Sequence, residues 1–154
     1  MAAQYNVDYT VKGYLAAGVP SNKIVMGAPI YGRAWSGVNK NSNNGLFASA
    51  TGAGQGTWEQ GSYDYADLLN KIKSDPSTYQ LHWDDLSQVP YIWAPNTQNG
   101  LFSTFESAQS ISKRVDYIKA NSLGGIMFWE ASADVRNANS PDSLIGTAFN
   151  KLNA

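Results

Sequence analysis

The clearest pattern along the chain is an amphipathic helix followed by a short apolar run. The spacing of the apolar residues predicts a helix over residues 7–17, and Gly18 and Pro20 are both residues that end helices. The next segment, residues 24–31, is a nearly continuous apolar run rich in β-branched residues, which is typical of a strand buried on both faces in a parallel sheet. The apolar face of the helix is formed by Val7, Val11, Tyr14 and Leu15.

The same order returns near the C-terminus. Ser107 is a suitable N-cap for a helix over residues 107–121, and the strand expected at residues 126–129 follows a Gly-Gly turn. The Ser-Pro-Asp sequence at residues 140–142 predicts the start of a last helix. Two strands buried on both faces need more sheet beside them, so the pattern predicts a piece of a larger α/β fold. The inner faces of the two helices are formed by Ile111, Val115 and Ile118, and by Leu144, Ile145, Ala148 and Leu152.

The middle of the chain has a different composition. Residues 36–61 are rich in Gly, Asn and Ser, which predicts a long loop with at most short strands. A helix is expected over residues 62–74 with Ser62 as its cap, and residues 79–94 alternate aromatic and polar side chains, as two antiparallel strands do. Residues 36–106 therefore form an α+β insertion between the two α/β pieces. The apolar stripe of the inserted helix is formed by Tyr65, Leu68, Leu69 and Ile72.

Charge and cysteine content exclude several classes of protein. The 154 residues carry 11 Lys and Arg against 12 Asp and Glu, so the formal net charge is −1 and the chain lacks the basic face of a nucleic-acid or membrane-surface protein. No apolar run approaches the roughly 20 residues of a transmembrane helix. The chain has no cysteine and one histidine, His82, so no disulfide, metal site or other cofactor is expected.

The aromatic content favours carbohydrate recognition. The chain has 5 Trp, 9 Tyr and 5 Phe but only 15% charged residues, and its polarity comes from Asn, Ser, Thr, Gln and Gly. Sugars stack their C–H faces on flat rings and form hydrogen bonds with amides and hydroxyls. Tyr31, Arg33 and Trp35 end one predicted parallel strand and Trp129 ends the other, at the strand ends where α/β proteins bind ligands. A sugar-binding site is therefore expected there.

Three segments resemble parts of a known family. Residues 27–35 and 124–134 resemble the penultimate and last barrel strands of the family 18 glycoside hydrolases, the chitinases, and residues 56–65 resemble the start of their chitin-insertion domain. The resemblance covers nearly the whole chain, in the same order. It implies an α/β fold that is the C-terminal segment of a (β/α)8 TIM barrel and carries an α+β insertion domain.

The resemblance also implies a division of the chain and a set of substrate contacts. Residues 1–35 and 107–154 would form the barrel segment, and residues 36–106 the insertion domain. The implied partner is chitin or N-acetylglucosamine oligosaccharides. The implied contacts are Tyr31, Arg33 and Trp35 on the first strand, Trp129 beneath the sugar at the −1 subsite, and Trp58 and Glu59 on the wall that the insertion adds.

Two motifs of the family are absent from this sequence. The D-x-x-D-x-D-x-E motif carries the catalytic acid, and the Tyr and Asp of the M-x-Y-D motif hold the N-acetyl group that acts as nucleophile; neither motif occurs here. Glu59 and Glu130 have no paired carboxylate at a recognisable spacing. No catalytic residue is therefore expected in this chain, and we expect the chain alone to be inactive.

Several alternatives stay open at this point. The chain could be a chitinase segment, a non-catalytic chitin-binding module derived from a chitinase, or a folding fragment without function. Tyr31 could be a core tyrosine, Arg33 could form a structural ion pair with Glu130 or Asp134, and Trp58 could pack inside the insertion.

Partners and location are further expectations from the sequence. The open edges of two apolar strands favour self-association, or association with the missing N-terminal half of a barrel. The resemblance implies a secreted parent protein, whereas the first residues show neither the charged nor the apolar region of a signal peptide.

Overall fold

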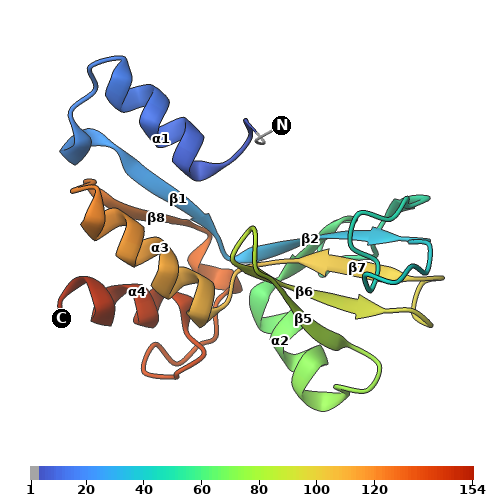
Figure 1. Cartoon of the computed structure of the whole chain (residues 1–154). Helices are drawn as coiled ribbons and strands as arrows, with labels where there is room; N and C mark the ends of the chain where they lie inside the picture. The colour runs from blue at the N-terminus through green and yellow to red at the C-terminus, as the bar shows by residue number, and fades with distance from the viewer. Residues whose placement is uncertain (1–3) are drawn as a thin grey trace.

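Two separate β-sheets organise the chain, and each has its own helices (Figure 1). The computed structural model describes residues 4–154; residues 1–3, part of the N-terminal segment without a signal-peptide pattern, lie outside the described residues. Within residues 4–154, no helix is both long enough and apolar enough to cross a membrane. The helices are α1 (Val7–Ala16), α2 (Tyr65–Ser74), α3 (Ala108–Ala120) and α4 (Leu144–Leu152), with 3₁₀ turns η1 (Ser21–Lys23) and η2 (Ala131–Ala133). The strands are β1 (Val25–Pro29), β2 (Tyr31–Ser36), β3 (Gly52–Ala53), β4 (Ser62–Asp64), β5 (Gln80–Asp84), β6 (Val89–Ala94), β7 (Leu101–Thr104) and β8 (Gly125–Trp129).

The smaller sheet is the parallel pair β1–β8, in which Pro29 lies opposite Trp129. Helices α1, α3 and α4 pack on one face of this pair, where Met26 and Ala28 are buried. The other face is open, since Val25, Met127 and Trp129 are 54%, 49% and 66% exposed. Residues 4–154 therefore do not complete the burial on both faces that the sequence pattern indicates, because helices cover only one of the two faces.

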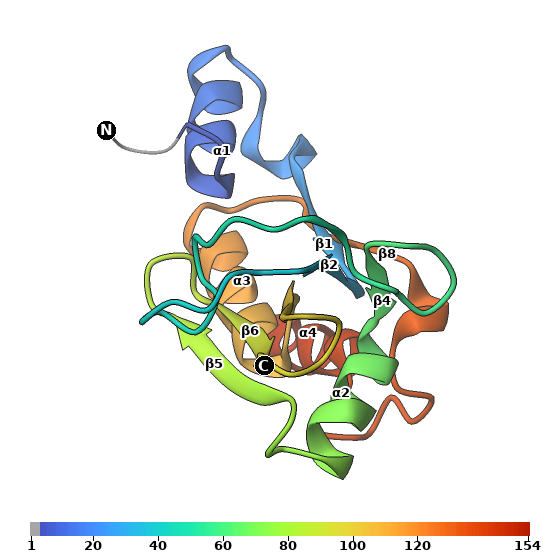
Figure 2. The same ribbon diagram turned by 90° about the vertical axis from the view of Figure 1, so that its right-hand side faces the viewer.

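The larger sheet is antiparallel, with strand order β3-β2-β7-β6-β5 and β4 paired with β2 as well. Helix α2 packs on one face through Leu68, and the loop after β2 covers the other (Figure 2). Val38 of this loop belongs to a buried cluster with Trp93 and Phe102. The pairing of β5 with β6 confirms the two antiparallel strands predicted over residues 79–94.

The chain passes from one sheet to the other at Ile30. The sequence predicts one strand over residues 24–31, but β1 ends at Pro29 and β2 begins at Tyr31. The fully buried Ile30 donates its backbone N–H to the carbonyl oxygen of Trp129, 2.7 Å away, and its own carbonyl accepts from the backbone N–H of Tyr65 at 3.2 Å. Residues 31–36 therefore belong to the antiparallel sheet, which begins inside the range 1–35.

Of the starts of α2, α3 and α4, the sequence predicts one correctly and places the other two too early in the chain. The cap at Ser107 is confirmed, because its side chain accepts from the backbone N–H of Ser110 in a capping box. The helix expected from residue 62 begins only at Tyr65, since Ser62 pairs with β2 as part of β4. The last helix begins at Leu144 with Ser143 as its N-cap, because Ser140 accepts the N–H of Asp142 in a preceding turn.

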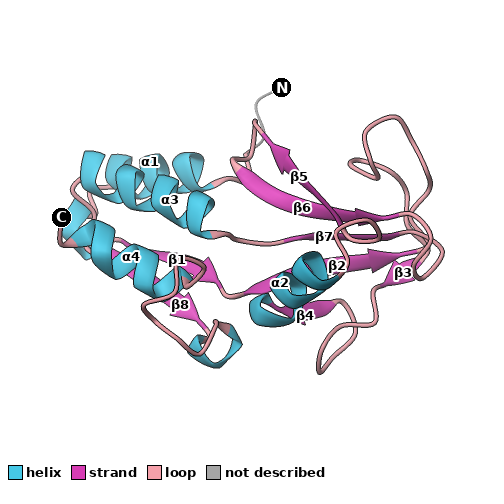
Figure 3. Cartoon of the chain, turned by 90° about the horizontal axis from the view of Figure 1, so that it is seen from below, coloured by secondary structure: helices cyan, strands magenta, loops and turns pink. Residues whose placement is uncertain are grey.

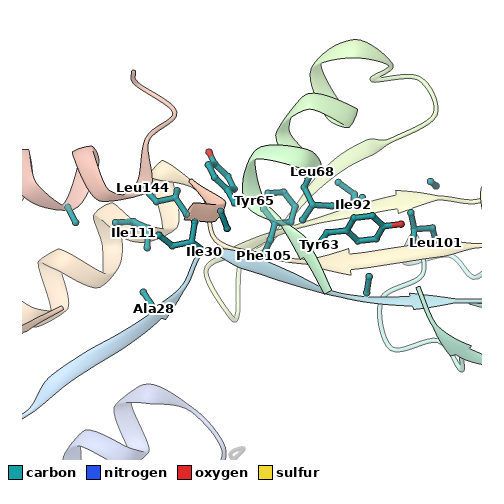
Figure 4. Close-up of a cluster of buried hydrophobic side chains, with 14 of the residues drawn as sticks. Ala28, Ile30, Tyr63, Tyr65, Leu68, Ile92, Leu101, Phe105, Ile111 and Leu144 are labelled. Atoms are coloured by element: carbon teal, nitrogen blue, oxygen red, sulfur yellow. The ribbon is translucent and has the colours of Figure 1, made fainter. Parts of the chain in front are cut away.

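The main apolar cluster runs through both halves of the molecule (Figure 4). Ala28, Ile111 and Leu144 come from the half with the parallel pair, and Leu68 and Ile92 come from the half with the larger sheet. Viewed from below, α1, α3 and α4 gather around β1 and β8, while α2 lies across the larger sheet (Figure 3). After the division that the resemblance implies, we call these halves the barrel-side lobe (β1, β8, α1, α3, α4 and η2) and the insertion lobe (β2–β7 and α2).

Candidate functional site

A cavity of about 440 Å³ lies where the two lobes meet. Its walls come from both lobes, so the site depends on residues far apart in the sequence. Five of the six predicted contact residues line it, and Trp35 does not. The insertion lobe contributes Tyr31, Arg33, Trp58, Glu59, Ser62 and Asp64, and the barrel-side lobe contributes Trp129, Glu130 and Ala133.

Strand β2 presents three predicted residues on one face. Tyr31, Arg33 and Trp35 alternate with the buried Ala34, as the two-residue period of a strand requires. Tyr31 is half-buried and lines the cavity, so it is not a core tyrosine. Trp35 lies roughly 13 Å farther along the strand than Tyr31 at about 3.3 Å per residue. It is 39% exposed, and its ring centroid is 6.1 Å from that of Phe102.

Arg33 lies over the ring of Tyr31, with its guanidinium carbon 5.0 Å from the ring centroid. This geometry is that of a cation–π contact. Among the residues that the structure describes, Arg33 forms no ion pair, so the alternative of a structural bridge to Glu130 or Asp134 is wrong. Asp134 is buried and accepts hydrogen bonds at the start of α4. The guanidinium is therefore free to contact a ligand.

Trp58 is 87% exposed at the mouth of the cavity, so it does not pack inside the insertion lobe. Its indole Nε1–H donates to Asp64 Oδ2 at 2.8 Å, which fixes the direction of the ring. The backbone N–H of Asp64 in turn donates to Thr57 Oγ1 at 3.0 Å. An exposed aromatic ring held by a hydrogen bond is a surface on which a flat ligand can stack at low entropic cost.

Trp129 forms part of the opposite wall, at the end of β8. Its ring is 66% exposed because it lies on the open face of the parallel pair. The Trp129–Glu130 peptide bond is cis. Glu130 Oε1 accepts from the hydroxyl of Ser132 at 2.5 Å, within the short turn that follows the strand.

Four cavity residues were not among the predicted contacts. Ser62 and Asp64 lie opposite Arg33 and Tyr31 in the β2–β4 register, and Glu130 and Ala133 lie directly after β8. The proximity of Ser62 and Asp64 to Trp58 and Glu59 in the sequence was an available signal. The helix assignment to residues 62–74 concealed it, because it placed Ser62 at a helix cap.

A second cavity, of about 710 Å³, shares Tyr31 and Arg33 with the first. It extends toward α3, where the buried Glu106 accepts from Ser110 Oγ at 2.6 Å and forms an ion pair with Arg114. Its other walls are the beginning of α1 and the β5–β6 turn. This cavity could not be predicted from the sequence, because four separate segments of the chain form it.

No group of three His, Asp or Glu side chains suited to a metal ion occurs within residues 4–154. His82 lies on β5, at the far side of the larger sheet from β2, and stacks on Tyr91 with ring centroids 5.2 Å apart. Burial lowers the pKa of His82, which favours a neutral imidazole. This histidine belongs to the packing of the insertion lobe rather than to the cavity.

The cavity has the chemistry of a binding cleft. Exposed indole rings on opposite walls can stack on the C–H faces of a ligand, and the tyrosine hydroxyl, the guanidinium and the carboxylates can form hydrogen bonds with its hydroxyl and amide groups. A neutral, flat and hydroxylated molecule matches this combination best.

Comparisons with known sequences all identify the same family of proteins. The family model for glycosyl hydrolases family 18 matches residues 1–134. Chitinase A1 of Niallia circulans is 42% identical over 135 residues, which is 86% of this chain and 19% of that protein. Endochitinase 1 of Metarhizium robertsii is 38% identical over 151 residues, which is 98% of this chain and 32% of that protein. The chain thus spans between one fifth and one third of the length of these relatives.

Solved structures agree with the sequence comparisons. Chitinase ChiA74 from Bacillus thuringiensis matches with a TM-score of 0.81 and 33% identity, over 95% of this chain and 25% of that one. Human YKL-39, described as a pseudo-chitinase with retained chitooligosaccharide binding, matches with a TM-score of 0.81 and 25% identity, over 97% of this chain and 40% of that one.

Proposed function

Because the chain belongs to glycosyl hydrolases family 18, we propose that it is the C-terminal part of a chitinase and supplies one side of the substrate cleft. The substrate class is β-1,4-linked N-acetylglucosamine polymer. The observation that carries this proposal is the cavity itself, in which Tyr31, Arg33, Trp58, Glu59 and Trp129 meet from distant parts of the sequence.

The architecture supports a division into a barrel segment and an insertion domain. From the sequence, the barrel segment comprises residues 1–35 and 107–154, and the insertion domain comprises residues 36–106. The sheet of the insertion domain begins slightly earlier, at Tyr31. In a closed barrel, helices cover the outer face of the strands, while side chains on the inner face fill the interior. The parallel pair has this asymmetry, since helices cover one face and Met127 and Trp129 are exposed on the other.

Each lobe would contribute a different part of the sugar contact. Trp129 offers a stacking surface beneath one sugar ring, and Tyr31 and Arg33 offer hydrogen bonds at its edge. Trp58 and Glu59 extend the wall on the insertion side. Trp35, outside the cavity but on the same strand face, would contact the chain farther along, because roughly 13 Å spans more than one sugar unit.

The proposed role excludes hydrolysis by this chain alone. Neither the D-x-x-D-x-D-x-E motif nor the M-x-Y-D motif is present in the sequence. The remainder of the barrel, which would cover the open face of β1 and β8, would have to supply both. The whole protein is proposed to be secreted, because a chitin-degrading enzyme meets its substrate outside the cell.

A non-catalytic chitin-binding module is the second candidate. It is favoured by the exposed indole rings and hydrogen-bonding groups of the cavity, which can hold a sugar without either of the missing motifs. In that case a second copy of the chain, rather than the missing barrel half, would cover the open face.

Retention on chitin beads, followed by calorimetry with tetra-N-acetylchitotetraose, tests binding by this chain. Trp129→Ala should abolish retention while the circular dichroism spectrum stays unchanged, and Trp83→Ala, on the far strand β5, is the matched control. Absence of binding by the unsubstituted chain, or an equal loss of binding in both variants, would contradict the proposal.

A further inference from the structure

The two walls of the cavity belong to different lobes, so their separation depends on how the lobes are held together. The chain crosses between the lobes at Ile30 and again between β7 and α3. Trp58 and Glu59 lie on the insertion side, whereas Trp129 and Glu130 lie on the barrel side. Any change in the angle between the lobes therefore changes the width of the cavity.

Tyr65, the first residue of α2, makes a polar contact across this boundary. Its hydroxyl donates to the carbonyl oxygen of Asp142 at 2.8 Å, and Asp142 lies directly before the N-cap of α4. The side chain is only 3% exposed, and its ring packs against Phe105 with centroids 6.4 Å apart. Figure 4 shows the Tyr65 ring between Phe105 and Leu144, where the two lobes join.

From Asp142 the hydrogen bonds continue to the cavity wall. Ser143 Oγ donates to Asp134 Oδ2 at 2.9 Å, and the Asp134 carboxylate also accepts the backbone N–H groups of Leu144 and Ile145. Asp134 closes the short turn that begins at Glu130 and contains Ala133, two residues that line the cavity. The hydroxyl of Tyr65 is thus connected to the turn after Trp129 through the half-buried Asp142, its peptide bond to Ser143, and the buried Asp134.

Beyond the backbone hydrogen bonds at Ile30, where the chain crosses between the lobes, the other contacts between the lobes do little to fix their relative orientation. The shared apolar cluster favours burial but not one orientation, since the hydrophobic effect is non-directional. The ion pair between Lys73 and Asp142 is largely exposed, and exposed ion pairs contribute little. Burial, with smaller contributions from the carboxylates of Asp142 and Asp134, raises the pKa of Tyr65 well above its usual value, so the phenol remains a donor.

We infer that Tyr65 is a positioning residue that fixes the insertion wall of the cavity relative to the barrel wall. Its hydroxyl holds α2 against the start of α4, and the Asp134 carboxylate transmits this position to the turn after Trp129. The inference rests on the proposed function only in that the cavity is taken to be the sugar cleft.

The test measures the distance between the lobes directly, in the absence of sugar. The chain has no cysteine, so Leu81→Cys on β5 and Phe149→Cys on α4, both at exposed positions, accept spin labels at two defined sites. Tyr65→Phe removes only the hydroxyl. Tyr117→Phe is the matched control, because its hydroxyl donates to the exposed Asp8 at 2.9 Å, within the barrel-side lobe. Asp134→Asn weakens the same connection at its other end, where Asp134 accepts from Ser143 Oγ.

Tyr65→Phe and Asp134→Asn should widen or shift the distance distribution, and Tyr117→Phe should leave it unchanged. An unchanged distribution in Tyr65→Phe, or equal widening in Tyr117→Phe, would overturn the inference. Where the parent chain binds tetra-N-acetylchitotetraose, Tyr65→Phe should lower its affinity about 3- to 10-fold relative to Tyr117→Phe, as the loss of one hydrogen bond predicts. Failure of every variant to bind sugar would contradict the proposed function, and the sugar-free distances would still decide the role of Tyr65.

Discussion

The carbonyl oxygen of Trp129 accepts a 2.7 Å hydrogen bond from the backbone N–H of Ile30. This contact joins the end of β8 to the residue at which the chain leaves one sheet for the other. Tyr31 follows Ile30 directly in the chain. The same hydrogen bond therefore brings Tyr31 and Trp129, two predicted sugar contacts, to the point where the two sheets meet. The cavity is therefore a consequence of where the chain changes sheets.

Trp129 should be the most sensitive position for sugar binding. Its ring is 66% exposed, so Trp129→Ala removes a stacking surface without opening a hole in the core, and stability should change by less than about 0.5 kcal/mol. Loss of a ring beneath a sugar should cost about 2 kcal/mol of binding free energy, on the scale of an interface hot spot. Calorimetry against Trp83→Ala measures the difference; equal effects of the two substitutions would remove Trp129 from the cleft.

The chain alone should not hydrolyse a fluorogenic chitobioside. General acid catalysis commonly supplies about 10²–10⁴ in rate, and the family's acid-bearing motif is absent from the sequence. The assay compares purified chain with a no-protein control over many hours. Turnover that disappears in Glu130→Gln would refute this prediction, because it would place an acid within the chain itself.

Asp134→Asn should destabilise the chain by about 2–3 kcal/mol. Asp134 is 7% exposed, and its Oδ2 accepts from both Ser143 Oγ and the N–H of Ile145, whereas the amide that replaces one oxygen cannot accept. The loss of a negative charge at the start of α4 adds to the effect. Urea unfolding at constant m-value measures the change. Asp116→Asn, which breaks the more exposed pair with Lys151, is the control and should cost under about 1 kcal/mol; equal costs would contradict the account.

The purified chain should associate with itself. Val25, Met127 and Trp129 expose an apolar face on a two-stranded sheet whose outer edges are unpaired within residues 4–154. Light scattering should give an average mass that rises with concentration, and Met127→Lys should lower it. A mass equal to that of one chain at high concentration would show that this face needs no cover.

Much of the fold could be read from local patterns, because the helices and strands have clear periodicity. The cap at Ser107 and the alternation in β5 and β6 are local features and were correctly predicted. The change of sheet at Ile30 was not predicted, since an apolar run has the same sequence pattern whether it stays in one sheet or passes into another. It is decided by the pairing of β2 with β7, about 70 residues later in the chain.

The candidate site was predictable for a different reason. Tyr31 and Trp129 each end a short apolar strand, and residues at strand ends gather at one edge of a parallel pair. Trp35 fails to reach the cavity because it continues along β2 beyond Arg33. The sequence left Asp134 open as a possible ion-pair partner of Arg33, because the backbone groups that it binds at the start of α4 become its neighbours only after the chain has folded.

The most direct test of the account is a titration of the ¹⁵N-labelled chain with tetra-N-acetylchitotetraose, observed through its tryptophan indole N–H signals. The chain has 5 tryptophans, and each can be assigned by single substitution. We predict that the signals of Trp58 and Trp129 shift together and saturate at one sugar concentration, while that of the buried Trp93 does not move. Unchanged Trp58 and Trp129 signals at saturating sugar, or shifts confined to Trp83 and Trp93, would contradict a sugar cleft between the two lobes.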